Sequence, residues 1–319
     1  MKRWSSAAVA CGFAATPAAA HELILRYDLP IPFDLYLIAC SVALVVTFIL
    51  SGLFMRMPSG GAAIAPRLGV AREETPLSSA ALRALRVGGL VGLALTLSTA
   101  LFGSRDPDQN LSLTLFWQIF LLGIPYATAL VGDVYALANP WKTIAEWLLR
   151  GRRARWQYPA WLGYWPAIAA YVALVWIELF AHPRPALLVQ MLIAYTLVTL
   201  AGAFAFGAAA WFRYGELFAV LLRIVGMLAP VRYRTDDDGR SWTVTLRWPF
   251  VGLVERPADR MSLVVFVLFM LSSTTYDGMH QTIFWMGLYY NHLIVALQPL
   301  WGTDLLASQQ MLEKWFSVY

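Results

Sequence analysis

The stretch ALLVQMLIAYTLVTLAGAFAFGAAAWF, residues 186–212, contains no charged side chain and decides the class of fold. A helix needs about 20 consecutive apolar residues to cross a bilayer, and this run is long enough. The pattern predicts an all-α, polytopic transmembrane helical bundle with six or seven spans. The last run is polar, so a re-entrant or interfacial helix is the alternative there. The other uncharged runs are residues 35–55, 87–104, 109–132, 156–177, 261–276 and 278–303.

The composition of the 319-residue chain agrees with a membrane protein. Charged residues make up 13% and hydrophobic residues 59%, whereas a soluble domain has roughly 25% charged residues. These fractions exclude a soluble enzyme domain and a disordered chain. The two cysteines, Cys11 and Cys40, are too few for a disulfide scaffold. The formal net charge of +5 does not indicate a nucleic-acid partner, because membrane topology accounts for the arginines between the apolar runs.

The N-terminus has the layout of a cleaved signal peptide. It starts with the basic pair Lys2-Arg3, continues with small and apolar residues, and reaches an A-x-A cleavage site at Ala18-Ala19-Ala20. The prediction is a signal peptide over 1–20 and a single transmembrane helical domain over 21–319, with His21 at the mature N-terminus. An uncleaved anchor and a lipoprotein anchor are the alternatives, but the apolar stretch is too short to span a bilayer.

The basic residues predict which side of the membrane each loop faces. With His21 outside and the spans alternating, segments 56–86, 142–155 and 213–260 are cytoplasmic. They hold 18 of the 24 lysines and arginines. Cytoplasmic loops carry such an excess, so the bias agrees with the signal peptide. The expected location is the bacterial inner membrane, with the mature N-terminus periplasmic.

The cytoplasmic segments are expected to carry short local structures. Residues 143–149 and 214–228 are predicted to be interfacial helices. The turn signal DDDG at 236–239 separates residues 231–235 from the alternating stretch 241–248, which predicts a β-hairpin.

Two acidic residues lie near the inner ends of spans. Asp133 is expected to cap a helix or to pair with Asn139 or a loop arginine, and a place in a transport path is the alternative. Glu216 is expected to form an interfacial ion pair with Arg213. Neither acid is assigned to the chemistry.

All four histidines fall on the outer side of this topology. Glu178 precedes His182 by one helical turn, and Asp277 precedes His280 in the same way. Ionisable groups at membrane depth are functional candidates by default, and histidine with carboxylate suits zinc, manganese, iron or copper. For each histidine the alternative is a hydrogen bond in helix packing. The candidate metal ligands are His21, His182, His280 and His292, and the candidate catalytic residues are Glu178 and Asp277.

Five motifs recur in order over residues 21–300. They are His21-Glu22, RYDLPIP at 26–32, NPW at 139–141, RYGE and FAV within 213–220, and SSTTYDG at 272–278. Together they resemble the membrane proteins called fenitrothion hydrolases, which are found in soil bacteria. The resemblance implies a multispanning protein that hydrolyses an organophosphorus triester at its P–O-aryl bond. Longer relatives continue past the position of Tyr319, which implies that a second subunit supplies further helices.

The histidines and carboxylates suggest how such a hydrolysis would proceed. A divalent metal held by His182, His280 and His292, with Glu178 or Asp277, lowers the pKa of a bound water. The resulting hydroxide attacks phosphorus, and a nitrophenolate-like group leaves without needing a strong general acid. An aryl pocket is expected at Trp285, Tyr289 and Tyr290, although an aromatic belt is the commoner use of such residues.

Two other classes of function remain open. The first is a copper-binding or copper-handling membrane protein, in which the amine and ring of His21 chelate one ion. The second is a transport or assembly subunit, with Asp133 and Asp277 in a transport path. In every class the polar residues of run 278–303 predict that a second membrane subunit or a second copy of the chain packs there, because unsatisfied polar groups are costly against lipid.

Overall fold

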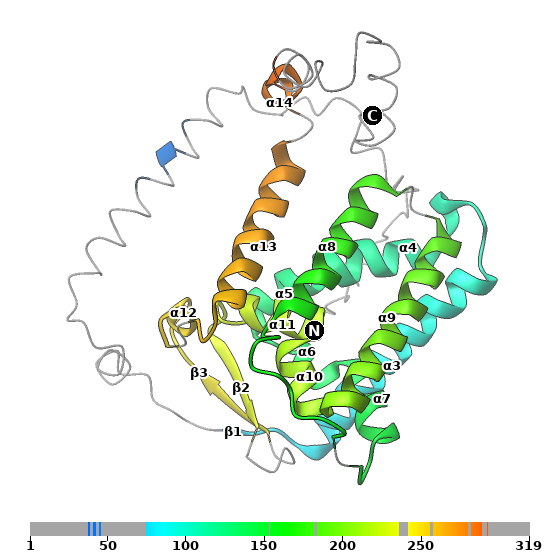
Figure 1. Ribbon diagram of the computed structural model, residues 1–319, viewed down its shortest axis with the longest axis vertical. Coiled ribbons are helices and arrows are strands. Elements are labelled where there is room, and N and C mark those ends of the chain that lie inside the picture. The colour runs from blue at the N-terminus through cyan, green and yellow to red at the C-terminus, as the bar shows by residue number, and fades with distance from the viewer. Residues whose placement is uncertain are drawn as a thin grey trace, which may run out of the picture.

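Figure 1 shows the computed structural model of the chain. The predicted signal peptide, nearly all of run 35–55 and most of run 278–303 lie outside the described residues. The structure describes residues 38, 41, 42, 45, 75–152, 154–181, 184–235, 242–255, 258–279, 282–288 and 292.

The all-α prediction is confirmed, because helices form nearly all of the regular structure described. Four helical stretches in this part of the chain are long and apolar enough to cross a membrane. Large apolar side chains such as Leu130, Leu197 and Leu268 are exposed on them, as expected of helices that face lipid. The stretches are α3 (Ser79–Phe102), Leu111–Val131, α9 (Pro185–Phe206) and α13 (Met261–Met279).

The second stretch is not a regular α-helix. It consists of α4 (Leu111–Leu113), the π-helical η3 (Thr114–Gly123) and α5 (Ile124–Val131). Pro125 lies in the first turn of α5 and has no N–H to donate. Local π-helical winding is a usual way for a membrane helix to accommodate a proline.

Helix α8 (Trp165–Phe180) begins later than the run at 156–177 predicts. Gly163 has a φ of +43°, and its carbonyl accepts a 2.7 Å hydrogen bond from the Tyr158 hydroxyl. The Trp156 N–H donates to the carbonyl of Ala205 at 2.9 Å. These contacts hold the first part of the run as a loop over the end of α9.

The run at 186–212 is interrupted at Gly207, whose φ is +82°. Helix α9 ends before this residue, and α10 (Ala208–Tyr214) folds back against it. A Cβ at Gly202 would overlap the ring of Trp211, so this close approach requires glycine. The composition of the run conceals the break, because both sides of it are apolar.

Short helices close one end of the bundle. They are α6 (Tyr135–Ala138), α7 (Pro140–Leu148) and α11 (Leu217–Val225). The prediction of an interfacial helix over 143–149 agrees with α7, on which Trp147 is exposed. The prediction over 214–228 is wrong in placement, because Leu217, Val220 and Leu222 of α11 are buried in the core.

A three-stranded antiparallel sheet lies at this end, in the order β1-β3-β2. Strands β2 (Val231–Thr235) and β3 (Trp242–Leu246) form the predicted hairpin, with Tyr233 opposite Val244. Strand β1 (Thr75–Pro76) adds a third strand that the sequence did not predict, with Thr75 opposite Val244.

The three segments predicted to be cytoplasmic therefore meet at one end of the bundle. The sheet joins the first and third segments, and an Arg86–Glu146 ion pair of 3.3 Å joins the first and second. We call this the sheet end. Figure 1 shows the sheet and α7 at the lower end of the bundle and α14 (Ile283–Leu288) at the upper end. The remaining short elements are η2 (Pro107–Gln109) and α12 (Val251–Glu255).

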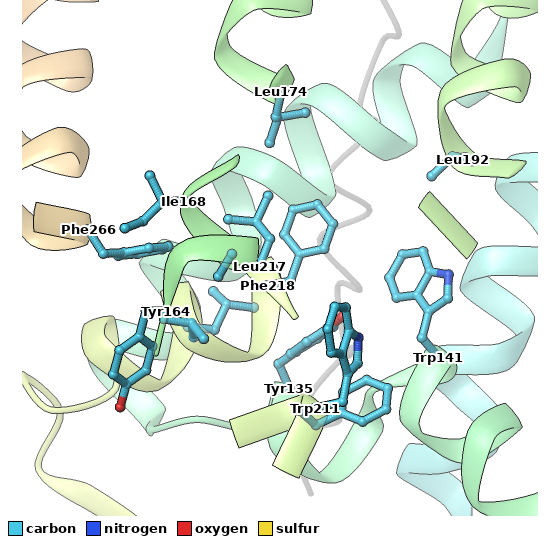
Figure 2. Packing of buried hydrophobic residues seen from close by; sticks show 14 of the residues in the cluster. Tyr135, Trp141, Tyr164, Ile168, Leu174, Leu192, Trp211, Leu217, Phe218 and Phe266 are labelled. Atoms are coloured by element: carbon cyan, nitrogen blue, oxygen red, sulfur yellow. The ribbon is translucent and has the colours of Figure 1, made fainter. Parts of the chain in front are cut away.

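Aromatic side chains fill the core near the sheet end. The Phe218 ring lies 4.8 Å from that of Phe120 and 5.9 Å from that of Trp141, between ring centroids. Figure 2 shows Trp141, Phe218 and Tyr135 arriving from three different helices. The core thus ties the short helices to the spanning ones.

Candidate functional site

The two predicted catalytic carboxylates lie on neighbouring helices, near the end opposite the sheet. Glu178 is in the last turn of α8 and Asp277 in the last turn of α13, and these helices pack against each other (Figure 1). The charge of Asp277 acts on the Glu178 carboxyl group, so the two side chains are close enough to interact. Both residues are exposed in the isolated chain. We call Glu178 and Asp277 the carboxylate pair.

The α8–α13 interface holds the carboxylate pair in place. The ring of Tyr171 on α8 lies 5.4 Å from that of Phe266 and 5.2 Å from that of Phe269 on α13. The hydroxyl groups of 272–275 donate to carbonyl oxygens of α13 itself, one turn earlier in the helix. Aromatic packing therefore joins the two helices. The serines and threonines that precede Asp277 on α13 add no charge next to the carboxylate pair.

The predicted metal ligands are mostly outside the described residues. His21, His182 and His280 are among those not described, and His292 is exposed. Within the described ranges, no group of three or more histidine, cysteine or acidic side chains is placed to hold a metal ion. The structure places the two carboxylates within electrostatic range of each other, and the metal site as a whole stays a prediction.

A second carboxylate arrangement lies near the sheet end and is buried. Glu216 is 1% exposed. Its Oε2 accepts hydrogen bonds from the Ala219 N–H at 2.6 Å and from Asn139 Nδ2 at 3.4 Å, and its Oε1 accepts from the Phe218 N–H at 3.3 Å and from the Tyr195 hydroxyl. We call Glu216, Tyr195 and Asn139 the Glu216 clasp. It connects α9 and the residue before α7 to the N-terminus of α11.

The predicted ion pair of Glu216 with Arg213 is wrong. All the hydrogen bonds of the Glu216 carboxylate described above come from other residues, while the Arg213 guanidinium lies over the ring of Tyr214 at 5.2 Å. Glu216 is instead the N-cap of α11. Capping satisfies the free N–H groups of the first helical turn, which explains an acidic residue directly before an apolar helix.

Burial sets the proton affinity of this carboxyl group. It raises the pKa of Glu216 from 4.5 to about 7, although hydrogen bonds from Tyr195, the α11 backbone and Asn139 act in the opposite direction. The Asn139 side chain also caps α7, because its Oδ1 accepts from the Lys142 N–H at 2.9 Å. Asn139 thus caps α7 and also donates to Glu216, the N-cap of α11. The clasp therefore has a structural role, because it connects the N-termini of two helices.

Asp133 also has a structural role, as the sequence predicts. Its Oδ1 accepts from the Ala136 N–H at 3.0 Å and caps α6. Burial raises its pKa to about 6, against the effects of this hydrogen bond and of the charges of Arg223 and Lys142. The cap prediction is therefore confirmed.

Sequence reasoning missed the importance of Tyr195 and Glu216. Tyr195 is a single polar ring within an apolar span, and its partner lies 21 residues further along the chain. The available signal was the acidic residue before the apolar stretch at 217–222, which has the form of an N-cap. Asn139 is 77 residues from Glu216, so no local pattern could connect the two.

Comparison with known proteins adds no family assignment. The chain has no match among protein-family models, among curated proteins or among solved structures.

Proposed function

We propose that this chain is a membrane-bound hydrolase of organophosphorus triesters, acting at the end of the bundle opposite the sheet. The observation that supports it is the carboxylate pair, in which Glu178 and Asp277 interact across two helices. Two carboxylates held near each other repel, and a divalent cation relieves that repulsion. His182 and His280 follow these carboxylates in the sequence and would complete the ligand set.

The proposed orientation places the sheet end in the cytoplasm. Segments 56–86, 142–155 and 213–260 are rich in arginine, and described parts of all three meet at that end. The positive-inside rule then assigns the sheet end to the cytoplasm of a bacterial inner membrane and the carboxylate pair to the periplasmic side. A substrate arriving from outside would reach the pair without crossing the bilayer.

This orientation can be tested by labelling single cysteines, in a chain whose two native cysteines are replaced by serine. Thr235 and Asp108 are exposed near opposite ends of the bundle. A membrane-impermeant maleimide applied to intact cells should label Asp108→Cys and leave Thr235→Cys unlabelled. The reverse pattern would contradict the proposed orientation.

In the proposed hydrolysis, some residues bind the metal and one carboxylate accepts a proton. His182, His280 and His292 with one carboxylate would hold a divalent ion, which when bound supplies Lewis-acid activation of water. The other carboxylate of the pair accepts the proton of the attacking water. The products are a dialkyl phosphate or thiophosphate and a nitrophenolate.

Aromatic side chains beside the pair suit an aryl leaving group. The ring of Tyr276, next to Asp277 in sequence, lies 5.5 Å from that of Trp285 in a T-shaped arrangement. Such an edge-to-face pair offers a ring face to an incoming aromatic group. Trp285 thus remains part of the proposed aryl site, and Tyr289 and Tyr290 lie outside the described residues.

The direct test is release of 3-methyl-4-nitrophenolate from fenitrothion by the purified, membrane-reconstituted chain. Glu178→Gln and Asp277→Asn should each lower the rate by roughly 100-fold or more, which is the scale of lost acid–base or metal-ligand function. Glu146→Gln changes a half-buried acid near the sheet end, is the matched control and should keep the rate. Wild-type rates in both pair variants would reject the proposal.

A further inference from the structure

A loop over the ends of two spanning helices carries aromatic rings and arginines on one surface. Residues 154–164 form this loop, which connects α7 to α8 near the sheet end (Figure 1). Arg260, just before α13, donates from its Nη1 to the carbonyl of Ala160. The Tyr164 N–H donates to Oγ of Ser262, in the first turn of α13, at 3.0 Å. The loop is therefore held against the start of α13 as well as over the end of α9.

A row of aromatic rings extends along this loop. Successive ring centroids lie 6.3 Å apart from Trp156 to Phe206, 5.2 Å from Phe206 to Tyr158 and 5.4 Å from Tyr158 to Tyr214. Phe206 is the last residue of α9 and Tyr214 the last of α10. The rings thus join the loop and the ends of both helices into one surface.

Three arginines lie over rings of this row. The guanidinium carbon of Arg155 is 5.2 Å from the Trp156 centroid. Those of Arg213 and Arg260 are 5.2 Å and 4.7 Å from the Tyr214 centroid, so two guanidinium groups border one ring. A stacked guanidinium still presents N–H groups at its edge, which can donate to an anion.

Ion pairs do not balance these positive charges. Among the described residues, Arg155, Arg213 and Arg260 form no ion pair with an acidic side chain. Asp259, the acid next to Arg260 in sequence, accepts a 3.2 Å hydrogen bond from the Tyr164 hydroxyl. The three guanidinium groups outnumber this acid, so the surface favours an anionic partner.

Exposed tryptophans indicate that the loop lies at the membrane surface. Trp156, Trp161 and Trp165 are 57%, 79% and 49% exposed. Tryptophan is enriched where the headgroups meet the hydrocarbon core, because its ring is apolar and its N–H is polar. Arginines beside such residues reach the phosphate groups of the adjacent lipids.

We propose that Arg155, Arg213 and Arg260 bind the phosphate of an anionic phospholipid of the phosphatidylglycerol type. Guanidinium groups bind phosphate oxygens through charge-assisted hydrogen bonds. Phosphatidylcholine carries the same phosphate together with a cationic choline, which the three arginines repel. The carboxylate pair lies near the opposite end of the bundle, so this lipid site does not depend on the proposed hydrolysis.

Quenching of one fluorophore by spin-labelled lipids tests the proposal on the full chain in phosphatidylcholine nanodiscs. Ala160 is an exposed residue of the loop, and Ala160→Cys keeps the carbonyl that accepts from Arg260. With the two native cysteines replaced by serine, this cysteine carries a nitrobenzoxadiazole label. Doxyl-labelled phosphatidylglycerol should reach half-maximal quenching at about one tenth of the mole fraction that doxyl-labelled phosphatidylcholine needs, because each nearby arginine favours an anionic lipid roughly fivefold.

Three variants at two arginines assign the preference to this surface. Arg213→Gln leaves the hydrogen bond between Arg260 and Ala160 in place and should reduce the preference roughly fivefold. Arg213→Lys keeps the charge and should retain most of the preference, which a packing role of the guanidinium would not allow. Arg83→Gln removes an exposed arginine of α3 and is the matched control, with the preference unchanged. Quenching by the phosphatidylcholine analogue should be the same in all these proteins, because the loop keeps its place.

Three results would overturn the assignment. The first is equal quenching by the two lipids in the chain with all its arginines. The second is an equal loss of preference in Arg83→Gln and Arg213→Gln, which would show a general effect of charge. The third is loss of the preference when inorganic phosphate is added at constant ionic strength, which would identify a soluble anion as the occupant.

Discussion

At the sheet end, Glu216 is buried and both of its carboxylate oxygens accept hydrogen bonds from the protein, whereas near the opposite end Glu178 and Asp277 are exposed and interact with each other. The first arrangement matches one acceptor group to donors from three helical segments. The second places two acidic side chains within electrostatic range of each other. A buried carboxylate of the first kind stabilises a fold, while an exposed pair of the second kind is suited to binding a cation.

Under the proposed function, the Glu216 clasp at the sheet end stabilises the fold, and the carboxylate pair near the opposite end takes part in the reaction. Changes in the Glu216 clasp should alter unfolding, and changes in the carboxylate pair should alter metal binding and turnover while the fold is kept. The opposite pattern, with a stable clasp variant that lacks activity, would place the chemistry at the sheet end.

The largest stability effect is expected for Glu216→Ala. The variant leaves the Tyr195 hydroxyl, Asn139 Nδ2 and two backbone N–H groups without their acceptor. Each buried donor left unsatisfied costs about 1–3 kcal/mol, so the total loss should be about 4 kcal/mol when partial relaxation is included. Chemical unfolding in detergent micelles measures it.

Glu146→Ala is the matched control for that variant. Glu146 forms surface ion pairs with Arg86 at 3.3 Å and Lys142 at 3.9 Å. Exposed pairs contribute about 0–1 kcal/mol, so this variant should unfold almost as the wild type does. Equal losses in the two variants would show that the clasp has no special role.

The pH dependence of stability should distinguish Glu216 from an ordinary carboxylate. Its pKa is about 7 in the folded protein and 4.5 as the usual value, so the folded state binds more protons between these values. The contribution is therefore fully present below about pH 4.5 and is lost as the pH rises through about 7. Asp133 adds a similar loss of stability as the pH rises from about 4 to about 6, because burial also raises its pKa. At about 1.36 kcal/mol per pKa unit, the upper limit is about 3 kcal/mol for each of the two groups and about 6 kcal/mol for both together.

Glu216→Gln isolates the contribution of this residue. The amide does not titrate, so the variant's melting temperature should be nearly constant above about pH 6, while that of the wild type continues to fall. Parallel melting curves of the two proteins across this range would show that Glu216 ionises normally.

Gly89→Ala and Gly88→Ala form a pair of neighbouring substitutions on α3. A Cβ at Gly89 would overlap the carbonyl oxygen of Ala138, which belongs to the backbone, whereas a Cβ at Gly88 meets open space. Gly89→Ala should cost about 2 kcal/mol through overpacking. Gly88→Ala should be neutral or stabilise by about 0.5–1 kcal/mol, because alanine favours the helix. Equal unfolding midpoints would contradict the close approach of α3 to α6.

Some features of the fold could be predicted from the sequence and others could not. The β-hairpin could be predicted because its turn signal and strand alternation are local. The ends of the spans could not, because Gly207 breaks an unbroken apolar run through its positive φ, and Gly163 delays the start of α8. Helix composition identifies apolar segments, but it does not record where the backbone turns.

The candidate sites divide in the same way. Glu178 and Asp277 were predicted from their charge within apolar segments, a signal visible in the sequence itself. Their electrostatic interaction was not predicted, because it depends on the packing of α8 against α13. The Glu216 clasp joins residues that are distant along the chain, and the local neighbour Arg213 was the wrong partner.

Within the Glu216 clasp, a smaller loss of stability than that of Glu216→Ala is expected for Tyr195→Phe. The variant removes one hydrogen bond to Glu216 and keeps the ring, whose centroid lies 5.0 Å from that of Trp141. The loss should be about 1–2 kcal/mol, the range for a hydrogen bond to a group that can be charged. A loss as large as that of Glu216→Ala would show that Tyr195, rather than the carboxylate, holds the clasp together.

The metal content of the purified chain tests the division between the two ends most directly. Plasma mass spectrometry should find about one zinc, manganese or copper ion per wild-type chain, as a single site of this ligand type would hold. The double variant Glu178→Gln/Asp277→Asn should lose that ion and keep its melting temperature, while Glu216→Gln should keep the ion. A double variant that retains the full metal content, or a Glu216→Gln chain that loses it, would contradict the account.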